Sequence, residues 1–292
     1  MADFSHLVST DWLDRHRHDN DVVVLDASVF LGPTPAGRVR GDFRSGYPAF
    51  LDEGHIPGAQ FADMFELFSD ASSALPFTRP QREQFEQAAG SLGISANSHV
   101  VIYDALVGQW ASRLWWVFHS FGHASVSVLD GGLHKYVAEG RALETGSPQP
   151  VSPKVYVAAS ATRRHAGIAD VQAIVDGQAQ GQLVCCLLPA DYDGSVVVRS
   201  RAGHIPGSVN LPFTSLLDER SHTFLPPQTL RALFESVVDL DGPPIITYCG
   251  GGIASTLGSL ALALIGCNNT AEFDGSLSEW VQDPARPMRV GS

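Results

Sequence analysis

Three short sequence patterns occur twice in this chain, in the same order and at nearly the same separation. The motif HIPG begins at His55 and begins again at His204, 149 residues later. The motif LDGGL of the first half matches FDGSL in the second half, 144 residues later. A third pattern, a β-branched run followed by a small-residue loop, places Asp104 opposite Cys249, 145 residues apart. Such spacing is typical of gene duplication, so we expect two copies of one α/β fold.

The length of the chain also suits two domains. It has 292 residues, and a domain commonly contains about 100 to 200. Hydrophobic residues make up 44% of the sequence, which is enough for two cores without disulfides or metals. Pro and Gly cluster between residues 146 and 153, as in a linker. We therefore expect a first domain over residues 1–140, a linker over 141–165 and a second domain over 166–292.

The charge of the chain restricts its partners. A formal net charge of −12 argues against general binding to nucleic acid or to an anionic membrane, because both require a surplus of Lys and Arg. The first residues, MADFSHLVST, lack the basic and apolar regions of a signal peptide. The four cysteines have neither zinc-ligand spacing nor the density of a disulfide scaffold. We expect a cytoplasmic protein with reduced thiols and no bound metal.

One cysteine has the surroundings of a nucleophile. The apolar run from Ile245 to Thr247 predicts a strand that ends just before Cys249, and an Ala- and Leu-rich helix follows the loop. Backbone N–H groups in such a loop and at a helix N-terminus favour negative charge, so they favour the thiolate over the thiol. Cys249 is thus the candidate nucleophile, and the predicted anion cradle consists of Gly250, Gly251, Gly252, Ile253 and Ala254.

The corresponding loop of the first half has Asp104 in place of the cysteine. Ligands of open parallel sheets gather beyond the carboxyl ends of the strands, where both loops are expected to lie. Because only the second copy has a nucleophile there, we expect one active loop. We interpret Asp104 as a structural residue of the degenerate copy.

These motifs resemble the two-domain rhodanese family, the thiosulfate and 3-mercaptopyruvate sulfurtransferases, over nearly the whole chain. The resemblance is carried by VVVLDAS, EGHIPGAQF, VVIYDA, RLWWVF, FGHASVSVLDGGL, AGHIPGSVNLPF, YCGGGIAS and EFDGSLSEW. It implies two tandem rhodanese-like domains, each a mainly parallel sheet flanked by helices. It also implies that Cys249 takes sulfane sulfur from a small anionic donor as a persulfide. Transfer to a thiol, cyanide or a protein acceptor would follow, without a cofactor.

The sequence departs from the family where the donor is bound. Members commonly have an Asp-Ala-Arg segment after the first strand of the second domain, and here Leu188 stands in place of its arginine. A second family arginine, after an aromatic residue, corresponds to Asp193. Thiosulfate-preferring members have basic residues directly after the cysteine, and mercaptopyruvate-preferring members tend to have Gly-Ser-Gly, whereas this chain has three glycines. The donor therefore stays open between the two.

Three other residues are candidates for the site. Arg199 and Arg201 are two positions apart and would point the same way in an extended segment, so either could replace the lost cations. The alternative is that both are solvated loop charges. His55 matches a family histidine proposed to assist the mercaptopyruvate reaction, which predicts a role at the domain interface. Its alternative role is to hold the HIPG turn by hydrogen bonds.

Two other functions compete with sulfur transfer for a reactive cysteine in such a loop. A cysteine-dependent phosphatase needs an arginine six residues after the cysteine to bind phosphate, and that position is Ser255. We therefore exclude phosphatase activity. The missing family arginines leave open a persulfide carrier or thiol sensor that docks to a partner protein without turnover.

Overall fold

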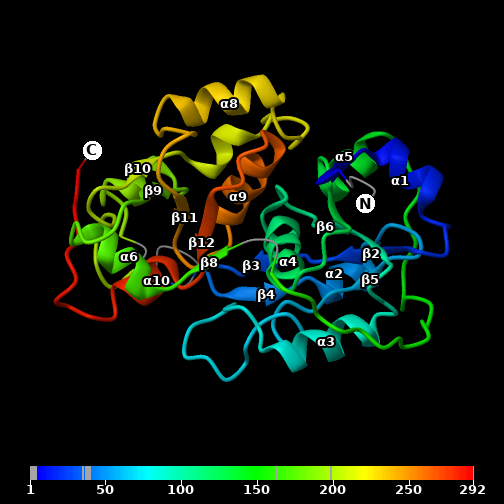
Figure 1. The fold of residues 1–292 in the computed structure, drawn as a ribbon. Helices are drawn as coiled ribbons and strands as arrows, with labels where there is room; N and C mark the ends of the chain where they lie inside the picture. The colour runs from blue at the N-terminus through cyan, green and yellow to red at the C-terminus, as the bar shows by residue number, and fades with distance from the viewer. Residues whose placement is uncertain (1–4, 35, 37–40, 162–163, 198, 292) are drawn as a thin grey trace.

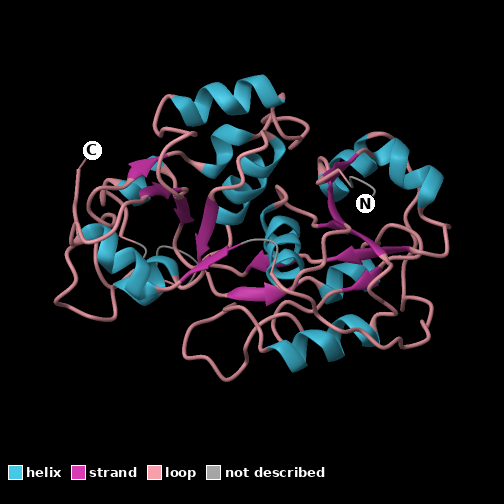
Figure 2. Ribbon diagram, viewed as in Figure 1, coloured by secondary structure: helices cyan, strands magenta, loops and turns pink. Residues whose placement is uncertain are grey.

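The computed structural model describes residues 5–34, 36, 41–161, 164–197 and 199–291. Its main features are two five-stranded sheets, each made only of parallel pairs and flanked by helices (Figures 1 and 2). The expected pair of mainly parallel α/β domains is thus confirmed. Among the described residues no helix is both long and apolar enough to cross a bilayer. The cytoplasmic location stays a prediction of the sequence.

The first sheet has the strand order β1-β7-β6-β2-β5. Its strands are β1 (Leu7–Val8), β2 (Val22–Asp26), β5 (Gln60–Phe61), β6 (His99–Tyr103) and β7 (Val126–Leu129). The helices of this half are α1 (Thr10–His16), α2 (Tyr47–Asp52), α3 (Arg82–Ser91), α4 (Gln109–Ser120) and α5 (Gly132–Ala138). A separate antiparallel hairpin consists of β3 (Val29–Leu31) and β4 (Phe43–Ser45).

The second sheet has the order β10-β9-β11-β12-β8. Its strands are β8 (Arg164–Ala166), β9 (Gln182–Cys185), β10 (Val209–Asn210), β11 (Ile245–Tyr248) and β12 (Thr270–Phe273). The helices are α6 (Ile168–Val175), α7 (Pro189–Tyr192), α8 (Pro227–Glu235), α9 (Ser255–Leu264), α10 (Ser276–Trp280) and the 3₁₀ turn η1 (Phe213–Leu216).

The two sheets have the same topology. If the second order is written from its other edge, β8-β12-β11-β9-β10, each strand corresponds in chain order to a strand of β1-β7-β6-β2-β5. The central strands β6 and β11 are buried along their whole length, as expected for parallel strands covered on both faces. The match of topology to the sequence repeat agrees with duplication of one ancestral fold.

Helices α4 and α9 join the two halves. They pack against each other, and they lie side by side in Figure 1. Almost all residues of both helices are buried, and α9 is rich in small residues that permit close approach. Ile253, Leu260 and Ala263 of the second half belong to the apolar core of the first half. The end of β11 is thereby placed against the surface of the first half.

The segment between the sheets packs on the first half. The backbone N–H of Lys154 donates to the carbonyl of Gly90 at 2.9 Å, and Tyr156 lies in the first core. Strand β8 begins at Arg164 because it pairs with β12, so regular structure of the second half begins slightly before residue 166. The predicted limits of the domains otherwise remain predictions.

Candidate active site

Cys249 lies at the carboxyl end of β11, between this strand and the first turn of α9. Only 3% of its surface is exposed, and it lines a cavity of about 400 Å³. Both halves of the chain contribute walls. The first half provides Leu31, Phe43, Pro76, Phe77, Gln109 and Trp110. The second half provides Leu187, Leu188, Asp191, Arg199, Phe213, Gly250, Gly251, Ile253, Ala254 and Ser278. The sulfur thus faces a mostly apolar space at the interface of the two halves.

Hydrogen bonds from the start of α10 hold the cysteine loop. The backbone N–H of Cys249 donates to Oγ of Ser276 at 3.1 Å, and the N–H of Leu277 donates to the carbonyl of Cys249 at 3.1 Å. Ser278 donates to the carbonyl of Gly250 through its N–H at 2.9 Å and its hydroxyl at 2.6 Å. The carbonyls of the loop are thereby turned toward α10.

The backbone N–H groups of the cysteine loop differ from its carbonyls, because they lack hydrogen-bond partners among the residues that the structure describes. In the structure of the described residues, no acceptor is bonded to the backbone N–H groups of residues 250–254. The degenerate loop of the first half contrasts with this arrangement, because the buried carboxylate of Asp104 accepts bonds of 2.8 to 3.0 Å from its own loop. The donors are the N–H groups of Leu106, Gly108, Trp110 and Ala111. One loop thus contains its own anion, and the other can receive one.

Close contacts surround two of the three glycines, and at Gly252 the contact is with the backbone. Gly252 has φ +73°, and a Cβ there would lie 2.2 Å from the carbonyl oxygen of Asp274. A Cβ on Gly250 would lie 2.4 Å from Nη2 of Arg199. At Gly251 the nearest atom would be Oγ of Ser278, at an ordinary 3.5 Å. The guanidinium of Arg199 therefore occupies the space in which a side chain directly after the cysteine would begin.

The structure separates the two candidate arginines. Nε of Arg199 donates to Oγ of Ser278 at 3.1 Å and to the carbonyl of Gly250 at 3.3 Å, and Arg199 lines the cavity. Arg201 instead donates to the carbonyl of Arg286 at 2.8 Å and does not line the cavity. The expectation that both point the same way is wrong, because residues 199–201 form bends and not an extended strand. Arg199 alone stays a candidate for donor binding.

The positions of the missing family arginines also differ from each other. Leu188 lines the cavity and is 37% exposed, so an apolar side chain stands where the family has a cation. Asp193 does not line the cavity, and its carboxylate accepts a 2.7 Å bond from the N–H of Ser195 in its own turn. Among the residues that line the cavity in the described structure, Arg199 is the one basic side chain.

His55 holds a turn of the first half. Its Nδ1 lies 2.8 Å from the carbonyl oxygen of Phe50, and its Nε2 lies 3.1 Å from Oε1 of Glu144. His204 matches the first of these contacts, with Nδ1 2.8 Å from the carbonyl oxygen of Tyr192. His55 is fully buried and does not line the cavity of Cys249. The predicted interface role of His55 is therefore corrected to the alternative, that of holding the HIPG turn.

Arg113 is a site residue that the sequence did not reveal. It lies on α4 of the first half and is fully buried, and its Nη1 donates to the carbonyl of Gly252 at 3.0 Å. Its Nη2 forms an ion pair with Asp274 and donates to the carbonyl of Phe77. The sequence feature that could have indicated Arg113 is its position as a charged residue in the otherwise apolar stretch RLWWVF. The first half thus supports the cysteine loop through a buried cation.

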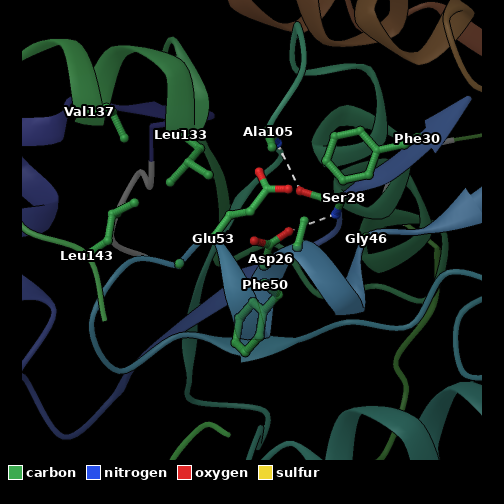
Figure 3. Close-up of a pocket in the computed structure, with 12 residues that line it drawn as sticks. Asp26, Ser28, Phe30, Gly46, Phe50, Glu53, Ala105, Leu133, Val137 and Leu143 are labelled. Carbon is green, nitrogen blue, oxygen red and sulfur yellow. Dashed lines mark hydrogen bonds between the residues drawn. The ribbon is translucent and has the colours of Figure 1, made fainter. Parts of the chain in front are cut away.

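A second cavity, of about 190 Å³, lies in the first half near the end of β2. Figure 3 shows Asp26, Ser28 and Glu53 among the residues that line it. The N–H of Ser28 donates to Oδ1 of Asp26 at 2.8 Å, and the Ser28 hydroxyl accepts a bond from the N–H of Ala105 at 2.9 Å. Burial raises the pKa of Asp26 to about 6, although hydrogen bonds from Ser28 oppose this effect. The described lining contains carboxylates but no basic or sulfur-containing side chain. This cavity does not suit an anionic sulfur donor.

Comparisons with known proteins agree with this geometry. The family model described as "Rhodanese-like domain" matches residues 9–139 and 165–283. The chain is 36% identical to 3-mercaptopyruvate sulfurtransferase from Homo sapiens, over 97% of this chain and 94% of that protein. It is 35% identical to thiosulfate sulfurtransferase from Rattus norvegicus, with the same coverage. The crystal structure of SseA from Escherichia coli, a 3-mercaptopyruvate sulfotransferase by its description, matches with a TM-score of 0.79 and 31% identity. That match covers 93% of this chain and 98% of SseA.

Proposed function

Because this chain belongs to the rhodanese family, we propose that it is a sulfurtransferase that carries sulfane sulfur as a persulfide on Cys249. The observation that carries this proposal is the pairing of a sulfur nucleophile with five backbone N–H groups that have no acceptor among the described residues. The Asp104 loop supports it, because the same type of loop there binds a carboxylate through four N–H groups. An anionic persulfide on Cys249 would take the equivalent place.

The chemistry consists of two displacements at sulfur. The Cys249 thiolate attacks the sulfur that is transferred, and an S–S bond forms as the bond between that sulfur and the rest of the donor breaks: an S–S bond in thiosulfate and a C–S bond in 3-mercaptopyruvate. With thiosulfate, sulfite leaves with the electron pair. With 3-mercaptopyruvate, the enolate of pyruvate leaves and takes up a proton. A thiolate or cyanide then attacks the outer sulfur of the persulfide and restores the thiolate. The backbone N–H dipoles of residues 250–254 stabilise the negative charge on sulfur in both steps.

The lining of the cavity restricts the size and the charge of the donor. Its walls are mostly apolar, and Arg199 provides a cation next to the loop in place of the arginine that Leu188 replaces. A small donor with one anionic group near its sulfur fits this arrangement, and both 3-mercaptopyruvate and thiosulfate have such a group. Since Gly251 leaves the loop without the hydroxyl of the Gly-Ser-Gly pattern, the choice between these donors is left to experiment.

Intact mass spectrometry tests the proposal directly. The protein is incubated with thiosulfate or, separately, with 3-mercaptopyruvate, and then with cyanide or a small thiol. We expect Cys249 to gain one sulfur atom from at least one donor and to lose it to the acceptor in repeated turnovers. If Cys249 gains no sulfur from either donor, the proposal is wrong. If it gains sulfur but releases it only to a protein acceptor, the chain is a persulfide carrier.

Removal of the Arg199 guanidinium tests the donor site. We expect Arg199→Ala to raise KM for the anionic donor by about tenfold or more, because a hydrogen bond to a charged group contributes roughly 1.5 to 3 kcal/mol. Arg201→Ala is the matched comparison, since Arg201 is bonded to the carbonyl of Arg286 outside the cavity. Steady-state kinetics with each donor measures both variants. Equal KM values for Arg199→Ala and wild type would show that backbone N–H groups alone bind the anion.

A further inference from the structure

A fully buried glutamate lies behind the cysteine loop. Glu272 belongs to β12, next to β11 in the sheet and covered by α9 (Figure 1). It is 1% exposed, and its carboxylate accepts hydrogen bonds from three hydroxyl groups. Thr247 donates to Oε2 at 2.6 Å, Ser259 donates to Oε2 at 2.8 Å, and Ser255 donates to Oε1. A buried ionisable group with this many partners is either a structural network or part of the chemistry.

One of the three hydroxyls also contacts the reactive sulfur. Oγ of Ser255 lies 3.4 Å from Sγ of Cys249, so Ser255 connects Cys249 with Glu272. The serine has a single hydroxyl proton, and it cannot donate to both neighbours at once. If that proton points to Glu272, Oγ accepts a bond from the thiol. If it points to Cys249, it stabilises a thiolate, and a protonated Glu272 can donate to Oγ.

Resting on the proposed persulfide chemistry at Cys249, we propose that Glu272 holds the proton that the thiol gives up, and that this proton passes through Ser255. The S–H bond of Cys249 breaks, its electron pair stays on sulfur, and an O–H bond forms at Oγ of Ser255. The former hydroxyl proton of Ser255 moves to Oε1 of Glu272. The total charge of the three groups does not change, and no oxidant or reductant is needed. Glu272 is a positioning residue, because it acts on Cys249 only through Ser255, which contacts both groups.

The ionisation of Glu272 suits this role. Burial raises its pKa to about 7, while hydrogen bonds from Ser255, Thr247 and Ser259 and the charge of Arg113 oppose the rise. Below this pH Glu272 is mainly protonated, and the Ser255 hydroxyl is available to a thiolate. Above it Glu272 is mainly ionised, and a second negative charge on Cys249 is disfavoured.

The other ionisable groups around Glu272 do not replace it in this role. Arg113 on α4 is a cation and forms its ion pair with Asp274. Cys186, which follows β9, is fully buried, and burial raises its pKa well above the ordinary value. His165 pairs with Glu272 in the sheet register, and burial lowers its pKa. Ser255 therefore provides the route from the sulfur to a carboxylate.

The pH dependence of Cys249 alkylation tests the proposal without any sulfur donor. The rate of iodoacetamide addition at Cys249 is measured by peptide mass spectrometry. We expect the wild-type rate to rise, to level off above about pH 7 and to rise again at higher pH. Glutamine has the same shape as glutamate but cannot ionise. The alkylation rate of Glu272→Gln should therefore rise in a single step as the pH increases. At one pH unit above the start of the wild-type plateau, the alkylation rate of Glu272→Gln should be about tenfold higher than that of the wild-type protein.

Ser255 variants provide an independent check should Glu272→Gln fold poorly. Ser255→Ala removes the bridge, so the plateau should disappear and the single rise should move to higher pH, whereas Ser255→Thr should restore the plateau. Thr256→Val is the matched control, because the buried Thr256 hydroxyl donates to the carbonyl of Ile253 and not to Glu272. It should keep the plateau.

Two results would overturn the inference. One is a plateau that persists in Glu272→Gln or Ser255→Ala, and the other is a single step in the wild-type protein. A purely structural Glu272 would give single-step profiles in all variants. The sulfur-uptake experiment is carried out on the same proteins. Uptake of sulfur together with a single-step profile would refute the proton route but leave the sulfurtransferase function intact.

Discussion

Replacement of Cys249 with serine is expected to abolish sulfur uptake from both donors. The hydroxyl of serine is a far weaker nucleophile at neutral pH than a thiolate, and it cannot form the S–S bond of a persulfide. We expect turnover to fall by at least about 10³-fold, which corresponds to roughly 4 kcal/mol in activation free energy. The product released to cyanide or a thiol measures turnover, and intact mass measures uptake.

The other cysteines provide the control for this result. Cys267→Ser should retain sulfur uptake, because Cys267 is not among the residues that line the cavity. Cys185 and Cys186 lie in the second core, and burial raises the pKa of Cys185 to about 12 and that of Cys186 well above its ordinary value. These two thiols stay protonated near neutral pH. Sulfur gained by Cys249→Ser would therefore contradict the assignment of the nucleophile.

Arg113→Met is expected to have the largest effect on stability. The substitution removes the cation from a fully buried ion pair and leaves the carboxylate of Asp274, which is 7% exposed, without it. Loss of one partner of a buried ion pair costs about 3 to 5 kcal/mol, mainly because the remaining charge is desolvated. The support of the Gly252 carbonyl is also lost, so sulfur uptake should slow. Urea denaturation gives the change in free energy of unfolding.

Two variants test whether Arg113→Met loses stability because the carboxylate of Asp274 is left without its ion-pair partner. Glu235→Gln removes an exposed ion pair with Arg231 on α8 and should cost less than about 1 kcal/mol. The double variant Arg113→Met, Asp274→Asn removes the uncompensated charge and should recover part of the stability lost in the single variant. Equal costs for Arg113→Met and Glu235→Gln would show that the buried pair does not stabilise the interface of the two halves.

Much of the fold was predictable because the strongest patterns in the sequence are local. The β-branched runs at β2, β6 and β11 predict buried parallel strands, and the structure places each between two other strands of its sheet. The repeat predicts two related sheets before any element is assigned. The short edge strands β1, β5 and β10 contain only two residues each, and their existence depends on a neighbouring strand. No local pattern of two residues can reveal such a strand.

The site was predictable in part for the same reason. Cys249 and its loop form one continuous segment, so the sequence reveals them together. Arg113 and Glu272 meet this loop only through the packing of α4 and β12, and Glu272 is 23 residues beyond the cysteine. The direction of Arg199 depends on bends that the alternation of an extended segment does not describe. Contacts made by tertiary packing are the part that pattern reasoning misses.

The carboxylate of Asp104 also determines how much sulfur one chain can carry. The N–H groups that bind it are permanently occupied by a group of the same polypeptide, so donor molecules find no free anion site in that loop. We therefore expect a loading limit of one sulfur atom per polypeptide, even at saturating donor. The chain then transfers one sulfur atom at a time, because Cys249 must release its sulfur before it can accept another.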